Sequence, residues 1–112
     1  MYNAYRDHTY ETLDHVDTFA DGIAVKTPGE TTFKMIEQYV DGIVTVSEDE
    51  IAAAILALME NQKLVAEGAG ATPVAAALFG KLPIEGKKTV CLISGGNIDV
   101  NILSRVITRG MI

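Results

Sequence analysis

Residues 94–97 (SGGN) place a hydroxyl, two glycines and a side-chain amide directly after the apolar run TVCLI, residues 89–93. A junction of this kind either makes a tight turn or lets a ligand come close to the backbone. The residues that follow have helical periodicity, and the free N–H groups at a helix start favour an anionic or polar ligand. Both interpretations remain open from the spacing alone.

Other candidates for chemistry are few. Glu67 stands in an apolar, glycine-rich segment, where its carboxylate could be buried and functional or could belong to a surface turn. The acidic run at residues 48–50 is explained by a helix start, where the helix dipole and capping favour carboxylates. His8 and His15 have no partners at the spacing of metal ligands. The spacing therefore nominates no metal site and no catalytic residue.

The elements around these residues alternate between short apolar runs and helical patterns. Strands are expected at 22–25, 42–46 and 89–93, because each is a short apolar run bounded by turn residues. Helices are expected at 30–40, at 48–61 after the N-cap Ser47, from Pro73 to about Gly80, and from 97 to the C-cap Gly110. This order predicts an α/β fold, a parallel sheet with helices on both faces, with SGGN at the C-terminal end of a strand.

Composition limits the function further. The 112 residues suffice for one domain or part of one, and a net charge of −6 with scattered basic residues argues against nucleic acid. Cys91 lies in an apolar run and predicts a buried thiol, which fits a reducing cytoplasm. The longest apolar run, 51–59, is too short for a membrane span, so we expect a soluble chain with no membrane partner.

Four segments in unbroken order carry a resemblance to a known family. They are DTFADGIAVKTPGETTF, IVTVSEDEI, LVAEGAGATPVAA and VCLISGGNIDVNILSRVITRG. Together they resemble the threonine dehydratase family, the threonine/serine ammonia-lyases of fold type II that depend on pyridoxal 5'-phosphate. The resemblance implies that residues 13–112 are the C-terminal portion of such a catalytic domain. The first twelve residues, MYNAYRDHTYET, show no clear period and are expected not to match.

The resemblance implies β-elimination of L-threonine to 2-oxobutanoate and ammonia, with serine as a second substrate, in an enzyme that is homo-oligomeric when complete. It implies that Ser94 faces the pyridine nitrogen of the cofactor, with Gly95, Gly96 and Asn97 beside it. A hydroxyl can bond an unprotonated ring nitrogen, which gives a weaker electron sink than an aspartate would. The other residues implied to line the cofactor site are Glu67, Asp21 and Gly22.

The departures from the family pattern limit what this chain is expected to do alone. The family's Schiff-base lysine, its phosphate-binding loop and the asparagine at the cofactor O3′ have no counterpart here, and no regulatory domain is expected. None of the lysines stands in the family's setting, so no catalytic residue is nominated and the isolated chain is expected to be inactive. An incomplete sheet would leave open edges and exposed apolar surface, which predicts a marginal, association-prone chain. The alternative is a stand-alone, non-catalytic binding or assembly module that keeps the fold.

Overall fold

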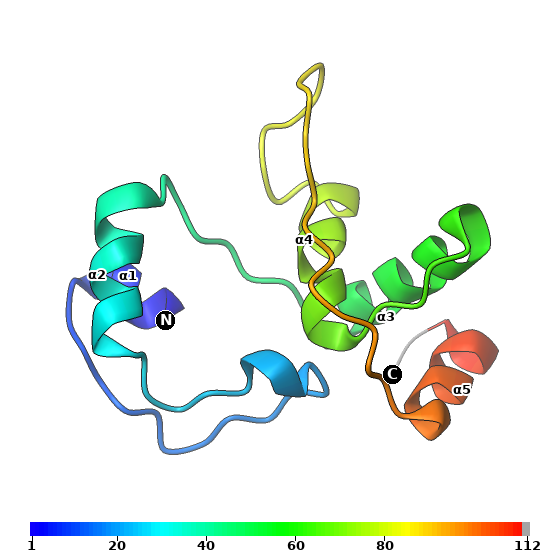
Figure 1. The fold of residues 1–112 in the computed structure, drawn as a ribbon, viewed down its shortest axis with the longest axis horizontal. Helices are drawn as coiled ribbons and strands as arrows, with labels where there is room; N and C mark the ends of the chain where they lie inside the picture. The colour runs from blue at the N-terminus through cyan, green and yellow to red at the C-terminus, as the bar shows by residue number, and fades with distance from the viewer. Residues whose placement is uncertain (111–112) are drawn as a thin grey trace.

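The structure is a computed structural model that describes residues 1–110, and it consists of helices joined by irregular connections. Figure 1 shows α3, α4 and α5 gathered together, with α1 and α2 paired at some distance from them. The body is flat, measuring 40 × 37 × 19 Å. The elements are α1 (Tyr2–Asp7), a 3-10 turn η1 (Asp21–Ile23), α2 (Glu30–Tyr39), α3 (Glu48–Ala57), a π-helical turn η2 (Leu58–Gln62), α4 (Gly68–Leu78) and α5 (Val100–Arg109).

Helix α3 begins as its sequence predicts. The Ser47 side chain accepts a hydrogen bond from the Glu50 backbone N–H, and the Glu50 carboxylate accepts one from the Ser47 backbone N–H, which is a complete capping box. The helical path continues through the wider turn η2 and ends where Lys63 takes a left-handed conformation, with φ of 58°. The predicted helix over 48–61 is therefore confirmed.

Helix α4 begins earlier than predicted, at Gly68, so the predicted start at Pro73 is wrong. Pro73 lies inside the helix, where its missing N–H leaves the carbonyl of Ala69 without its usual backbone donor. The Thr72 hydroxyl donates to that carbonyl at 2.9 Å and supplies the missing hydrogen bond. A threonine directly before the proline thus lets the helix pass through Pro73.

The two remaining predicted helices are present. Helix α2 spans Glu30–Tyr39, close to the expected 30–40. Helix α5 begins three residues later than predicted, because Asp99 is its N-cap and accepts from the Asn101 backbone N–H at 2.7 Å. Gly110 ends α5 in a left-handed conformation, with φ of 68°, as the sequence predicts. Helix α1 has no counterpart among the predicted elements.

No strand occurs among residues 1–110, so the predicted parallel sheet is not confirmed. The segment 22–25 lies partly in the turn η1, and the segments 42–46 and 89–93 are irregular (Figure 1). A strand exists only when a neighbouring strand completes its hydrogen-bond ladder, and none of the three segments pairs with another. Val46 and Ile93 still pack against the core, but Val90 and Leu92 remain in water, 94% and 77% exposed.

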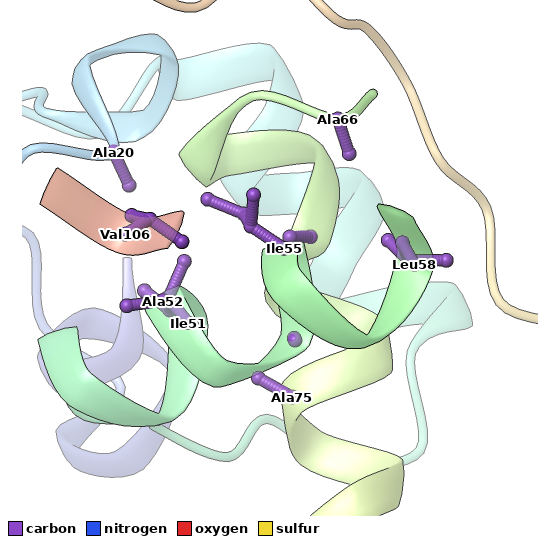
Figure 2. Packing of buried hydrophobic residues seen from close by; sticks show 10 residues of the cluster. Ala20, Ile51, Ala52, Ile55, Leu58, Ala66, Ala75 and Val106 are labelled. Carbon is purple, nitrogen blue, oxygen red and sulfur yellow. The ribbon is translucent and has the colours of Figure 1, made fainter. Parts of the chain in front are cut away.

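The hydrophobic core lies between α3, α4 and α5 and is made mainly of alanine. Figure 2 shows Ile55 of α3 among the buried side chains, with Val106 of α5 and Ala75 of α4 in the same cluster. Ile55 and Val106 are the largest side chains that are fully buried. Alanines let the helices approach closely but contribute little apolar area each, so this core supplies modest stability. The predicted contact of α3 with a sheet is replaced by contacts with α4 and α5.

Glu50 makes the stability of this helical unit depend on pH. The hydrogen bond from the Ser47 backbone N–H, followed by the Lys81 ammonium group at 3.0 Å, lowers the pKa of the Glu50 carboxyl below its ordinary value of 4.5. A carboxyl with a lower pKa in the folded state stabilises that state above about pH 4.5 and loses the contribution as pH falls further. We expect the free energy of unfolding, measured in urea at a series of pH values, to fall over this acidic range.

The variant Glu50→Gln should show a shallower acidic fall, because glutamine can still accept from the Ser47 N–H but does not titrate. Glu60→Gln is the matched control, since it removes one exposed carboxylate of the π-helical turn. Identical acidic slopes in wild type and Glu50→Gln would contradict the assignment.

Candidate functional site

The two motifs EGAG (67–70) and SGGN (94–97) lie in contact, although they are distant in sequence. The backbone N–H of Glu67, the residue before α4, donates to the carbonyl of Gly95 at 3.1 Å. A methyl group placed on Gly70 would lie 2.7 Å from the same carbonyl oxygen. The SGGN segment therefore crosses the first turn of α4 at backbone distance.

The two glycines of SGGN lie where the chain leaves little room for a side chain. A side chain on Gly95 would collide with a carboxylate oxygen of Glu67, and one on Gly96 would lie 2.5 Å from the carbonyl oxygen of Val65. At Gly96 the obstacle is backbone, so glycine is required there, whereas the carboxylate that meets Gly95 is the end of a flexible side chain and can move. The geometry leaves Ser94 and Asn97, the two ends of the motif, as its solvent-exposed polar groups.

A small cleft beside this crossing brings together three of the predicted site residues, Asp21, Glu67 and Asn97. It encloses about 50 Å³, room for only a few water molecules, so it is one corner of a larger site at most. The other residues that line it are Phe19, Gly68, Ile98, Asp99 and Ile102. None of these five residues was predicted for the site, although Phe19 stands two residues before Asp21.

The remaining predicted residues lie near this cleft in the chain but do not line it. Ser94, the residue before Gly95, is exposed. Gly22 is exposed beside the first turn of α4, where a methyl group on it would lie 3.0 Å from the Ala69 side chain. The structure thus places all the predicted segments around the start of α4 and joins three of the predicted residues in one cleft.

The cleft is acidic. Asp21, Glu67 and Asp99 contribute three carboxylates, of which Asp99 also caps α5, and no lysine or arginine lines the cleft. An anion such as a phosphate group would be repelled here, whereas a neutral or cationic edge of a ligand would be accepted.

Among residues 1–110 no three His, Cys, Asp or Glu side chains are arranged to hold a metal ion. Over the same residues, no helix combines the length and the apolar character of a membrane span.

Comparison with known protein families gives one match that covers most of the chain. The family described as pyridoxal-phosphate dependent enzyme matches residues 1–96, a range that includes the first twelve residues. The chain therefore belongs to the family of pyridoxal-phosphate dependent enzymes, and the resemblance predicted from the motifs is confirmed.

Individual relatives agree with this family. L-threonine ammonia-lyase from Thermotoga maritima is 55% identical over 102 residues, which are 91% of this chain and 25% of the relative. The processed form of threonine deaminase isoform 2 from Solanum lycopersicum superposes with a TM-score of 0.84 at 33% identity, over 96% of this chain and 32% of the structure. The crystal structure of serine racemase from Dictyostelium discoideum gives a TM-score of 0.77 at 34% identity, over 88% of this chain and 31% of that structure. The chain spans about a quarter of the length of the curated relatives it matches.

Proposed function

We propose that this chain is part of the catalytic domain of a pyridoxal-phosphate-dependent threonine (serine) dehydratase, which converts L-threonine to 2-oxobutanoate and ammonia. The observation that carries the proposal is the crossing of SGGN over EGAG, with Asp21, Glu67 and Asn97 in one cleft beside it. The names of relatives described above support the substrate class. The complete enzyme is proposed to act as a homo-oligomer.

The chemistry of the cleft fits one edge of pyridoxal phosphate. Its carboxylates repel a phosphate dianion and so favour the uncharged end of the ring, where a hydroxyl can donate to an unprotonated ring nitrogen. The exposed Ser94 hydroxyl is the group proposed to bond the ring nitrogen. Ser94 is next to Gly95, whose carbonyl accepts a hydrogen bond from the Glu67 N–H. Bound pyridoxal phosphate supplies an electron sink for the Cα carbanion of an amino acid.

This chain's own residues have positioning and binding roles in the proposal. Gly95 and Gly96 fix the path of the motif, and Ser94 and Asn97 present its polar groups. Glu67 and Asp21 keep the cleft anionic, which disfavours entry of the substrate carboxylate at this edge. The lysine that moves the Cα proton and the groups that hold the phosphate are assigned to the part of the relatives that this chain does not span.

The part of the relatives that this chain does not span is also proposed to complete the sheet. The segments 42–46 and 89–93 carry apolar, β-branched side chains yet have no ladder partner among residues 1–110. Strands from the rest of the domain would satisfy their backbone groups and cover Val90 and Leu92. The predicted parallel sheet with helices on both faces is therefore proposed for the complete domain.

A chimera tests the proposal. The matching 102-residue segment of the Thermotoga maritima enzyme is replaced by the segment of this chain, which is 55% identical to it. We expect the purified chimera to bind pyridoxal phosphate, seen by visible absorbance, and to release 2-oxobutanoate from L-threonine. Ser94→Ala in this chimera should lower kcat/KM by roughly tenfold, the loss of one hydrogen bond to the reacting group.

Ser104→Ala, an exposed position in α5, is the matched control and should leave kcat/KM unchanged. A chimera that elutes as a folded oligomer but binds no cofactor would overturn the proposal. Thermal unfolding of the 112-residue chain alone, with and without pyridoxal phosphate, tests the alternative of a stand-alone binding module. A ligand that binds only the folded state raises the melting temperature of the chain.

A further inference from the structure

Glu48 differs from the two acidic residues that follow it in the first turn of α3. Its carboxylate accepts a hydrogen bond at 3.0 Å from the backbone N–H of Phe19, which lies 29 residues earlier in the chain. Glu50 is occupied by the capping box and by Lys81, and Asp49 is exposed. A helix start alone explains carboxylates in this turn but does not explain a bond to a distant loop.

The loop that Glu48 holds is packed tightly against the start of α4. Ala20 is fully buried, and a methyl group on Gly68 would lie 2.9 Å from the Ala20 Cα and 3.2 Å from the ring of Phe19. Within the loop, the Thr18 hydroxyl accepts from the Ala20 N–H at 3.1 Å. Figure 2 shows the Ala20 side chain directed into the core cluster that contains Val106.

This loop supplies one side of the cleft. Phe19 and Asp21 line the cleft, and both flank the buried Ala20. Glu67, the residue before α4, and Asn97, at the end of the SGGN crossing, also line the cleft. The bond from Phe19 to Glu48 joins the loop to α3, which itself packs against α4.

We propose that Glu48 is a positioning residue of the cofactor site: through the Phe19 N–H, it holds the loop 18–22 so that Phe19 and Asp21 face Glu67 and Asn97. The bond joins a charged acceptor to a half-buried backbone donor, the stronger kind of hydrogen bond. The expected effect on catalysis rests on the proposed function, whereas the effect on the loop does not.

Hydrogen exchange measures the loop directly, in the 112-residue chain and in the chimera. In Glu48→Ala, exchange of the Phe19 and Ala20 amides should accelerate by roughly tenfold to a hundredfold, the population change that follows loss of a charge-assisted hydrogen bond. Glu48→Gln keeps an acceptor oxygen and should restore most of the protection. Asp49→Ala removes the same charge from the same helical turn and should leave exchange of these amides unchanged.

Kinetics of the chimera measure the consequence for the site. Glu48→Ala should lower kcat/KM by roughly tenfold, with Glu48→Gln closer to wild type and Asp49→Ala equal to it. Equal acceleration of exchange in Glu48→Ala and Asp49→Ala would overturn the proposal, because the effect would then be that of helix charge alone. Faster exchange in Glu48→Ala with unchanged kcat/KM in an active chimera would also overturn it. A wild-type chimera that binds no cofactor would refute the proposed function, and hydrogen exchange would still decide the role of Glu48 in the loop.

Discussion

Replacing Gly70 with alanine is expected to lower the free energy of unfolding by about 1 to 3 kcal/mol, the usual cost of inserting a methyl group into packed structure. The added Cβ would lie 2.7 Å from the carbonyl oxygen of Gly95, and that oxygen belongs to the backbone and cannot rotate away. The segment 94–97 must therefore move off the first turn of α4. This movement would break the 3.1 Å bond from the Glu67 N–H to the same carbonyl.

The sign of this change is informative, because glycine to alanine inside a helix ordinarily stabilises by roughly 0.5 to 1 kcal/mol. Gly42→Ala is the matched control, since a methyl group there meets nothing within 4 Å and the substitution should be neutral or slightly stabilising. Urea unfolding followed by circular dichroism measures both variants. A stabilised Gly70→Ala variant would show that the two motifs do not touch.

The sequence allowed the helices to be predicted well where local signals were complete. The helix after Ser47 has its cap, its acidic first turn and its helix-forming residues within a few positions, and its predicted place is correct. The predicted start of α4 is wrong because Pro73 resembles a first-turn proline, and only the structure shows that Thr72 replaces the missing donor. A helix that continues through a proline because one side chain pairs with one particular carbonyl leaves a weak trace in sequence.

Strands and site contacts could not be predicted to the same degree, because both depend on distant partners. The runs 42–46 and 89–93 have strand composition, but a ladder needs neighbours that residues 1–110 do not supply. Motif recognition indicated Asp21, Glu67 and Asn97, which the structure brings into one cleft. The bond from Phe19 to Glu48 gave no sequence signal, since a helix start already explained the carboxylate of Glu48.

Ile55→Ala is expected to have the largest effect of any single truncation in the core, a loss of about 2 to 5 kcal/mol. Ile55 is completely buried in α3, between α4 and α5, and most of its neighbours in the cluster are alanines (Figure 2). The six alanines of the cluster have no spare length with which to fill the space, so the cavity would close only in part. Because single domains are stable by only about 5 to 15 kcal/mol, the variant would lose a large part of its stability.

Ile107→Ala is the matched control, because this isoleucine lies in α5 with 51% of its surface exposed and should cost about 1 kcal/mol or less. Urea unfolding at several protein concentrations separates loss of the core from dissociation, since only the latter shifts the midpoint with concentration. Equal losses for the two variants would mean that the alanine-rich contact between α3, α4 and α5 is not the stabilising core. Ala20 shares this cluster with Ile55. The Ile55→Ala substitution would therefore also displace Ala20, and with it the loop that carries Phe19 and Asp21 to the cleft. The stability of the core and the geometry of the site are thus coupled through the same few side chains.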